Sequence, residues 1–428
     1  MKDIVLGHKI ERDELFRQDF VLREGIEEAR KSLDTNLIKV IVGPRRAGKS
    51  VFALQLLQDI DFAYLNFDDE RLAGISDYDD ILKAIIQVYG NTRYFLFDEI
   101  QNLERWELLV NRLQRRGYNL VLTGSNSRLL SAELASHLTG RYLQFQVFPF
   151  SITEFLKAKD FPLDEMIELK EKQGMLLSHL DDYMLSGGFP EVVVKGIDQQ
   201  GYLKTLFDGI LFKDIVKRYN VRQPQRLYDI GLYLLTNHSN EFSLTRLKNM
   251  LGFRSIHTVE AYFGFLKEAF LVFDMERFSF KLREKMKSPR KVYGYDTGMI
   301  HAVKFRTSPD RGRLLENLVA IEFLRQGSDF YYYRTKDNKE VDFVIRDGLE
   351  VSRLIQVSYK MDSDPQTEKR EISALLKAAK ELECDDLAIL TWDQETERMV
   401  NGKKVMIVPL WRWIISQRAP SQSQNVSK

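Results

Sequence analysis

One segment limits the fold of this chain more than any other. Residues 43–50 read GPRRAGKS, which fits the pattern G-x-x-x-x-G-K-S. The β-branched run at residues 37–42 is typical of a buried strand, and the VFALQLLQDI that follows the segment has helical apolar spacing. In this order, backbone N–H groups at the start of the helix can surround a phosphate group. We therefore predict that Lys49 neutralises phosphate charge and that Ser50 offers a hydroxyl to Mg²⁺.

Strands and helices alternate from this segment to about residue 150. Helices are predicted between strands that we place at residues 62–69, 94–101, 118–127 and 142–147. Such alternation is typical of an open α/β sheet whose strands are mostly parallel. Residues 12–33, before the first strand, are charged and helix-periodic. We predict that residues 1–150 form a phosphate-loop core with a helical lead-in at its N-terminus.

Two acidic residues end the apolar run YFLF. Asp98 and Glu99 follow it directly, so a parallel sheet would place them at the strand edge that faces the phosphate loop. One carboxylate can hold the water shell of Mg²⁺ while the other orients the water that attacks the phosphate. A pair that merely caps the strand and begins a turn is the alternative.

Five further positions are candidates with weaker signals. Ser125 and Asn126 end the fourth strand and can contact the γ-phosphate or the attacking water, although Gly-Ser-Asn is also a common turn sequence. Arg141 can act as an arginine finger, in its own chain or in a neighbouring subunit, and a solvated arginine at a strand start is the alternative. Arg45 and Arg46, inside the loop, can touch phosphate or acidic partners.

The rest of the chain has a different pattern. Residues 151–236 are mostly helical and form a predicted connector or lid, and the closing residues 416–428 are a polar tail, predicted to be disordered. In residues 237–305, two helices at 244–250 and 255–269 precede a strand-like run and a basic run. That order favours a winged helix-turn-helix with a hairpin wing.

The basic run stands out because the whole chain is nearly neutral, with 63 Lys and Arg against 62 Asp and Glu. Its seven cations face one acid, Glu284, and on a wing beside Arg254, His257 and Lys267 they would neutralise the phosphates of double-stranded DNA. A solvated hairpin or a protein-docking surface is the alternative. The seven cations are Arg277, Lys281, Arg283, Lys285, Lys287, Arg290 and Lys291.

Residues 306–415 form a second α/β block whose charged residues resemble a PD-(D/E)xK nuclease core. Glu316 on a helix and Asp342 in a strand fit the acidic positions, which in that chemistry hold Mg²⁺. The third motif departs from the pattern, because Gln356 replaces the acid and the nearest lysine is Lys360. Strand alternation would return Lys360 to the face of Gln356. We favour a degenerate nuclease fold that binds over an active nuclease.

At this point the sequence resembles a family, the archaeal and bacterial AAA+-type ATPases with a C-terminal domain of uncharacterised function. The resemblance rests on IKVIVGPRRAGKS, FDEIQ, LTGSNSRLLS and LTGRYLQFQVFPFSITEFL, and continues through GGFPEVV and ILFKDIVKRY. It implies an ASCE-type phosphate-loop core, a helical connector, a winged helix and a nuclease-like C-terminal fold. It also implies Mg²⁺ on Asp98 and Ser50 and an activating carboxylate on Glu99. Predicted nucleotide contacts are Gly43, Pro44, Arg45, Arg46, Ala47, Gly48, Lys49, Ser50, Val51, Ser125 and Asn126.

Composition indicates in which compartment the protein acts. The single cysteine, Cys384, excludes an internal disulfide, and no apolar stretch is long enough for a membrane span, so we expect a cytoplasmic protein without a membrane partner. The expected ligands are ATP and Mg²⁺, and the expected macromolecular partner is double-stranded DNA. Two alternatives stay open, an ATP-gated DNA nuclease and a non-hydrolysing nucleotide switch that scaffolds a protein partner. A homo-oligomer also stays open.

Overall fold

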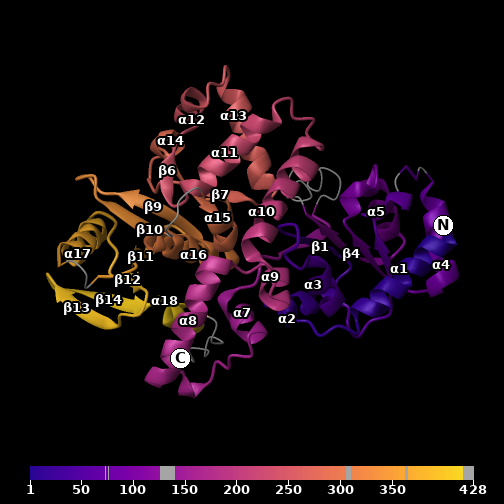
Figure 1. Ribbon diagram of the computed structural model, residues 1–428, viewed down its shortest axis with the longest axis horizontal. Coiled ribbons are helices and arrows are strands. Elements are labelled where there is room, and N and C mark those ends of the chain that lie inside the picture. The colour runs from indigo at the N-terminus through magenta and orange to yellow at the C-terminus, as the bar shows by residue number, and fades with distance from the viewer. Residues whose placement is uncertain (73, 76, 126–139, 305–309, 362–364, 418–428) are drawn as a thin grey trace.

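The computed structural model describes residues 1–72, 74–75, 77–125, 140–304, 310–361 and 365–417. Figure 1 shows the N-terminal α/β part at one end of the molecule, the C-terminal sheet at the other, and helices between them. No helix in the described ranges is long and apolar enough to cross a membrane. Cys384 is buried and free.

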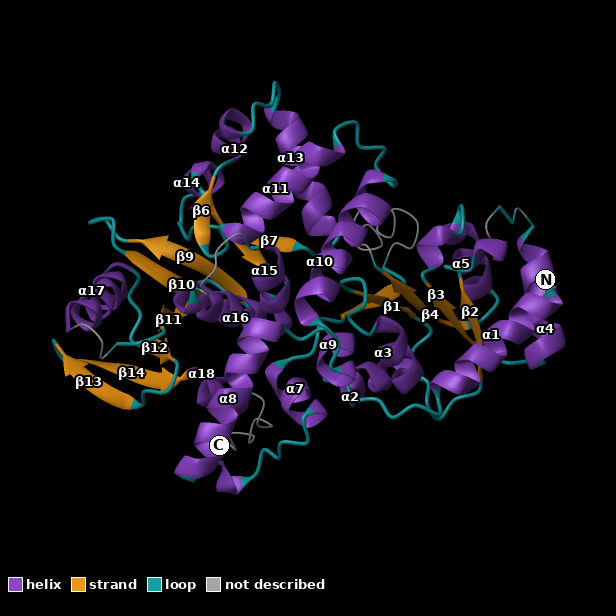
Figure 2. Ribbon diagram, in the orientation of Figure 1, coloured by secondary structure: helices purple, strands orange, loops and turns teal. Residues whose placement is uncertain are grey.

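The N-terminal sheet has five parallel strands, which confirms the predicted parallel α/β sheet. Their order is β2-β3-β4-β1-β5. Helices α1 (Lys2–Leu15), α4 (Tyr78–Tyr89) and α5 (Trp106–Arg115) pack on one face, and α2 (Ile26–Lys31) and α3 (Lys49–Leu56) pack on the other (Figure 2). Both faces are covered, which is why β1 is buried along its whole length. The strands are β1 (Ile38–Val42), β2 (Phe62–Asn66), β3 (Tyr94–Asp98), β4 (Asn119–Gly124) and β5 (Tyr142–Gln146).

The N-terminal lead-in differs from the predicted helix over residues 12–33. The first helix ends at Leu15, and residues 16–25 are not helical. Tertiary contacts replace the helical hydrogen bonds in this segment, because the backbone N–H of Arg23 donates to Gln55 and that of Glu24 donates to Glu154. The periodic pattern of residues 12–33 therefore predicted more helix than the structure has.

The predicted helical connector is confirmed as a helical region. It comprises α7 (Ile152–Ala158), α8 (Lys170–Ser186), α9 (Pro190–Lys195), α10 (Gln199–Gly209), the π-helix η6 (Ile210–Val216) and α11 (Pro224–Thr236). The GGFPEVV segment makes a tight junction between α8 and α9. Gly188 accepts a hydrogen bond from the N–H of Phe150, and a Cβ at Gly188 would lie 2.2 Å from the Phe150 carbonyl oxygen. Only Gly187 of the two glycines has a positive φ.

A small antiparallel sheet, ordered β6-β8-β7, follows the helical region. The expected hairpin wing is wrong in one respect, because a short helix, α14, interrupts the connection between β7 and β8. In chain order, the elements of this region are β6 (Asn240–Phe242), α12 (Leu244–Met250), α13 (Ile256–Glu268), β7 (Val272–Met275), α14 (Leu282–Lys287) and β8 (Arg290–Gly294). The next helix, α15 (Thr297–Val303), packs back against α8 and α10.

The C-terminal sheet is mixed, with the order β13-β14-β12-β11-β10-β9. Helix α17 (Pro365–Glu381) packs on one face, and α16 (Arg311–Arg325) and α18 (Leu410–Ser416) pack on the other. Residues 396–400 and 410–416 were not predicted as a strand and a helix. The strands are β9 (Asp329–Arg334), β10 (Glu340–Asp347), β11 (Glu350–Ser358), β12 (Leu387–Thr391), β13 (Thr396–Val400) and β14 (Lys403–Pro409).

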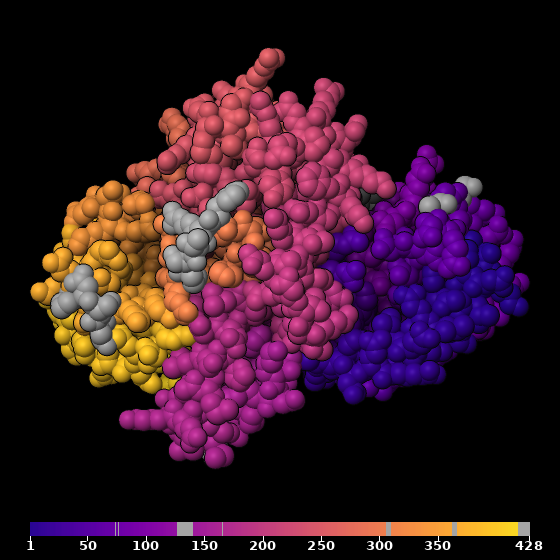
Figure 3. All heavy atoms as spheres, viewed as in Figure 1, coloured from indigo at the N-terminus to yellow at the C-terminus, as the bar shows by residue number. Residues whose placement is uncertain are grey.

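One hydrophobic core runs from the helical region through the small sheet to the C-terminal sheet. It includes Phe155 and Leu180 of the helical region, Tyr293 of β8, and Phe343 and Trp413 of the C-terminal part. The space-filling view in Figure 3 shows these parts in continuous contact. Three segments that the sequence predicts as separate modules therefore share one core, and the module bounds themselves stay a prediction.

Candidate functional site

Residues 43–48 form a tight loop between β1 and α3, and two of its glycines have positive φ. Gly43 has a φ of 153°, and a Cβ there would lie 1.9 Å from the carbonyl oxygen of Val147. Gly48 has a φ of 91°, and its Cβ would lie 2.6 Å from the guanidinium of Arg23. A larger residue at either position would strain the loop or displace a neighbour. The local geometry therefore requires both glycines of the motif.

Lys49 is the first residue of α3, and its side chain is only 4% exposed. Its ammonium group donates to the carbonyl oxygen of Pro44 at 3.1 Å and lies 3.6 Å from a carboxylate oxygen of Glu99. Both contacts hold the positive charge above the loop, where a phosphate group would lie. Ser50 follows Lys49, and its hydroxyl lies close enough to Asp98 to act against the rise in the pKa of that carboxyl.

Asp98, the last residue of β3, is buried in a network of hydroxyl groups. Its carboxylate accepts hydrogen bonds from Thr123 Oγ1 and from Tyr64 Oη, the latter at 3.2 Å. Burial, together with the negative charge of Glu99, raises the pKa of Asp98 above its usual value. The same Thr123 oxygen accepts the backbone N–H of Glu99 at 3.0 Å. Thr123 therefore positions both members of the acidic pair.

Glu99 lies just beyond β3 in a left-handed backbone conformation, with a φ of 48°. This conformation is rare for a non-glycine residue and directs the side chain back toward Lys49 and β4. Burial alone would raise the pKa of Glu99, but the charge of Lys49 and hydrogen bonds from Gln101 and Ser125 lower it. The two carboxyl groups thus have pKa values shifted in opposite directions, which suits two different roles.

The residues of this site fit a nucleotide with Mg²⁺. The loop has no room for a Cβ at Gly43, its lysine is buried and directed into it, and α3 begins at its end. The side chains of Ser50 and Asp98 supply the oxygen ligands that Mg²⁺ prefers. Such an arrangement can bind phosphate groups and place a carboxylate beside them.

Arg23 is a residue of the site that the sequence did not predict. Its guanidinium donates to the carbonyl oxygens of Ala47 and Phe148, both at 2.7 Å, and to Glu154 at 2.8 Å. Arg23 is 5% exposed, and its hydrogen bond to Ala47 stabilises the loop backbone. Its partners lie 24 to 131 residues away in the sequence, so no local spacing signals its role.

The two loop arginines bind acids of the helical region. Arg45 pairs with Asp214 of η6 at 2.9 Å, and Arg46 pairs with Glu191 of α9 at 3.4 Å. Burial raises the pKa of Asp214, and the nearby Glu99 acts in the same direction. Of the two roles that we predicted for these arginines, the one observed is contact with acidic partners. Helices in the π conformation occur often at functional sites.

The remaining candidates of the phosphate site have different outcomes. The backbone N–H of Ser125 donates to Glu99 at 3.3 Å, so Ser125 lies at the site. Asn126 lies outside the described residues. The prediction that Arg141 reaches the phosphates of its own chain is wrong. Tyr142 pairs with Ile38 and Gln146 with Val42, so the backbone of Arg141 lies at the opposite end of these strands, roughly 20 Å from Gly43.

A second charged cluster lies where the small sheet meets the C-terminal sheet. The ammonium of Lys291 is 2.9 Å from Glu316, 2.6 Å from Glu340 and 3.5 Å from Asp342. Its side chain is 2% exposed, and Tyr293 also donates to Glu316 at 2.7 Å. The basic run predicted that Lys291 lies on a DNA-facing surface, and this prediction is wrong. Lys291 instead neutralises the acids of the nuclease-like site.

The other nuclease-like residues also differ from the predicted arrangement. Gln356 accepts the backbone N–H of Asp342 and donates to Glu371, so both ends of its amide are used within the protein. Lys360 is exposed and lies beyond β11, which ends at Ser358, so strand alternation does not return it to the face of Gln356. Burial raises the pKa of Asp342, with the charge of Glu316 adding to it. Within the described ranges, no group of three or more His, Cys, Asp or Glu residues is arranged to hold a metal ion.

The rest of the basic run is partly neutralised by acids that the sequence order did not bring together. Arg290 pairs with Asp274 at 2.7 Å, and Lys285 pairs with Glu276 at 2.9 Å. Lys267, expected on the same surface, also pairs with Asp274. The positive surface is therefore smaller than the sequence predicts, and it is concentrated around α14.

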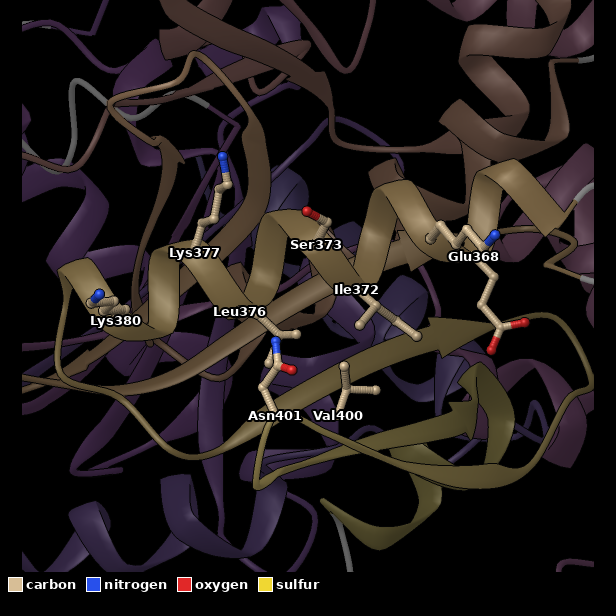
Figure 4. A pocket seen from close by; sticks show the side chains of 9 residues that line it. Glu368, Ile372, Ser373, Leu376, Lys377, Lys380, Val400 and Asn401 are labelled. Atoms are coloured by element: carbon tan, nitrogen blue, oxygen red, sulfur yellow. The ribbon is translucent and has the colours of Figure 1, made fainter.

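A shallow hollow of about 670 Å³ lies in the C-terminal domain, between α17 and the turn that joins β13 to β14. Figure 4 shows Ile372, Leu376 and Val400 at its floor, with Lys377 and Lys380 on the helix. None of the predicted site residues lines it, and it has no contact with the phosphate loop.

Comparison with known proteins defines the class. Residues 35–156 match the AAA domain family, residues 177–310 match a domain of unknown function (DUF8612), and residues 311–413 match another (DUF4143). This is a phosphate-loop ATPase of the AAA class with two additional domains.

Two relatives extend the comparison to the whole chain. An uncharacterised protein of Methanocaldococcus jannaschii is 34% identical over 97% of this chain and 98% of its own length. An uncharacterised protein of Haemophilus influenzae is 33% identical over 77% of this chain and 84% of its own. The chain therefore belongs to the family of these proteins. The resemblance to archaeal and bacterial ATPases with a C-terminal domain of unknown function is confirmed to that extent.

Two solved structures match this chain with low scores. A Walker-type ATPase of Pyrococcus abyssi has a TM-score of 0.44 at 14% identity, with 67% of this chain and 97% of that chain covered. The ORC1 protein of Aeropyrum pernix, solved in complex with DNA, has a TM-score of 0.30 at 12% identity, with 72% and 94% covered. Both scores are below 0.5, and we draw no conclusion from them.

Proposed function

We propose that this AAA-domain protein binds ATP at residues 43–50, hydrolyses it with Mg²⁺, and transmits the nucleotide state to its C-terminal half. The observation that carries the proposal is the contact of Lys49 with Glu99, beside Ser50 and the buried Asp98. Lys49 and Ser50 begin α3, and Asp98 and Glu99 lie at the end of β3, at the edge of the sheet where parallel strands end.

Each residue has a role that its environment supports. Lys49 and the loop N–H groups bind the phosphates, and Ser50 and Asp98 would hold Mg²⁺. When bound, Mg²⁺ would supply positive charge beside the phosphate oxygens. Glu99, whose pKa is lowered by Lys49, is ionised at neutral pH and can orient water. The backbone N–H of Ser125 donates to that carboxylate, and the hydroxyl oxygen of Thr123 accepts the backbone N–H of Glu99.

The route from nucleotide to the C-terminal half runs through the helical region. Arg45 and Arg46 of the loop bind Asp214 and Glu191, which lie on helices whose apolar faces belong to the core shared with the C-terminal half. A γ-phosphate would compete with these acids for the two arginines, because phosphate forms strong charge-assisted hydrogen bonds with guanidinium groups. Loss of the two ion pairs would then shift the helices.

We further propose that residues 237–305, with α11 of the helical region packed against α13 and β8, form a winged helix-turn-helix that binds nucleic acid. The support is the order α11, β6, α12, α13, β7, β8 with the antiparallel sheet β6-β8-β7, together with the basic residues that flank α14. Arg254 is exposed at the start of α13, the helix that would face the duplex. An ATP-gated nuclease is disfavoured, because Lys291 already neutralises Glu316 and Asp342.

The test is Mg²⁺-dependent ATP hydrolysis by the wild type, Lys49→Ala and Glu99→Gln, each with and without double-stranded DNA. Lys83→Ala, an exposed lysine of α4, serves as the control. We expect turnover by the wild type and the control, stimulation by DNA, and loss of turnover in both site variants, with ATP binding retained in Glu99→Gln. Tight ATP binding without turnover by the wild type would replace this proposal with a nucleotide switch.

A further inference from the structure

A groove of about 890 Å³ lies between the segment that carries α14 and the turn that joins β9 to β10. Residues 276–278 run beside β9, with the N–H of Phe278 donating to the carbonyl oxygen of Tyr332 at 2.7 Å. This contact fixes one wall, from the small sheet, against the other wall, from the C-terminal domain. The position of α14 next to β9 can be followed in Figure 1.

Both walls of the groove are basic. Six cations and two carboxylates, Glu284 and Glu381, line it. Among the described residues, four of the six cations form no ion pair, namely Arg277, Arg283, Lys287 and Lys336, whereas Lys281 and Arg334 do. Because the rest of the basic run is neutralised by acids of β7, this groove retains the excess positive charge of the region.

An exposed aromatic ring stands at the groove. Phe280 is 73% exposed and packs edge-on against Phe278, with ring centroids 5.0 Å apart. Phe278 is itself buried and contacts Tyr331, so the exposed ring has a rigid support. Leu282 and Met286 of α14 are 71% and 74% exposed. An exposed apolar cluster among cations marks an interaction surface.

We propose that this groove binds single-stranded nucleic acid. Proteins that bind single strands combine a basic groove, which follows the phosphates, with aromatic side chains on which bases stack. Phe280 can stack only on a base that is unpaired, because the bases of a duplex are already stacked on each other. The proposal rests on the nucleic-acid binding proposed above, and it adds the strand type and the contribution of the C-terminal domain through Arg334 and Lys336.

The test is fluorescence anisotropy with the full-length protein and labelled oligo-dT, oligo-rU and duplex DNA of about 20 units, long enough for one or two binding sites. The variants are Phe280→Ala and the double charge reversal Arg283→Glu/Lys287→Glu. Arg115→Glu/Arg116→Glu is a matched double reversal of exposed residues at the end of α5, far from the groove. The midpoint of thermal unfolding checks that each variant is folded.

We expect Phe280→Ala to weaken oligo-dT binding by about tenfold, since stacking on one aromatic ring is worth this much. The double reversal weakens oligo-dT binding further. It also reduces the steepness of the slope of log K against log salt concentration by roughly 1.4, because two phosphate contacts are lost. The α5 reversal changes neither. Comparison of oligo-dT with oligo-rU assigns the strand as DNA or RNA.

Single-strand binding that is unchanged in both groove variants would overturn the proposal. So would duplex binding that is tighter than oligo-dT binding and unchanged in both groove variants, although the duplex proposal would then stand. If no nucleic acid binds, both nucleic-acid proposals fail together, and ATP hydrolysis, measured separately, still decides the phosphate site.

Discussion

The ammonium group of Lys291 lies 2.9 Å from a carboxylate oxygen of Glu316, and the two side chains are 2% and 12% exposed. Lys291 belongs to β8 of the small sheet and Glu316 to α16 of the C-terminal domain. The ion pair therefore joins two parts of the shared core, and it places a cation among acids that a nuclease would use for metal.

We predict that Lys291→Met destabilises the protein by about 3 to 5 kcal/mol, because three carboxylates would lose their buried partner. Urea unfolding measures this change. The double variant Lys291→Met/Glu316→Gln, which removes one charge of each sign, should recover part of the loss. A stable Lys291→Met protein that gains Mg²⁺-dependent DNA nicking would mean that the acids form a gated nuclease site.

Arg23 supports the phosphate loop, so Arg23→Met should weaken both folding and nucleotide binding. The substitution leaves Glu154 buried without its guanidinium partner and frees the carbonyl oxygen of Ala47. We expect a loss of about 3 to 5 kcal/mol in unfolding free energy. Arg30→Met, which breaks a half-exposed pair with Glu27, is the control and should cost under about 1 kcal/mol. Equal effects of the two substitutions would contradict the supporting role.

Thr123→Val should reduce hydrolysis more than ATP binding. Valine has the shape of threonine but neither donates to Asp98 nor accepts the N–H of Glu99. The acidic pair would lose its positioning, while the phosphate loop stays intact. We expect a loss of about 1 to 3 kcal/mol in stability and a fall in kcat that exceeds the change in KM. Thr92→Val, which removes one buried hydroxyl bond at the other end of β3, should leave kcat unchanged.

Asp214→Asn should tighten ATP binding about two- to fivefold, as expected for the loss of a half-buried ion pair that competes with phosphate. Arg45 would be released from Asp214, and one negative charge near Glu99 would disappear. Titration with a fluorescent ATP analogue measures the change. Glu191→Gln, which releases the more exposed Arg46, should have a smaller effect. Weaker ATP binding in Asp214→Asn would show that Asp214 supports the loop and does not compete with the nucleotide.

His238 should make the protein sensitive to acid. Burial lowers the pKa of His238 to about 3, from an ordinary value of 6.5, with the charges of Lys304 and Arg313 acting in the same direction. Below pH 6.5 the unfolded chain therefore binds a proton that the folded protein does not. Stability from this residue is complete above that pH and decreases by about 1.4 kcal/mol per pH unit as the pH falls toward 3.

The measurement is the unfolding free energy of the wild type and His238→Gln between about pH 7 and about pH 5, the range in which the unfolded histidine titrates. The wild type should lose more stability over this range than the variant, because other groups titrate in both. Parallel pH profiles would contradict the neutral, buried state of His238.

The local chemistry of the phosphate site could be predicted from the sequence. The strand and the eight-residue motif are contiguous, and the carboxylates directly follow YFLF at the end of a parallel strand, so backbone geometry determines where they lie. Prediction failed where a charge pattern was interpreted without its surroundings. Residues 12–33 are only partly helical, Arg141 lies at the wrong sheet edge, and Lys291 is buried.

What the sequence by itself determined was the class of the N-terminal fold, because strand, loop and helix follow one another within a few residues. Only the tertiary structure decided which distant side chains complete that fold. Arg23 meets Glu154 across 131 positions, Arg45 meets Asp214 across 169, and Lys291 meets Asp342 across 51. The physical reason is that a buried charge requires a partner wherever packing brings one, and packing over such separations leaves no periodic signal in the chain.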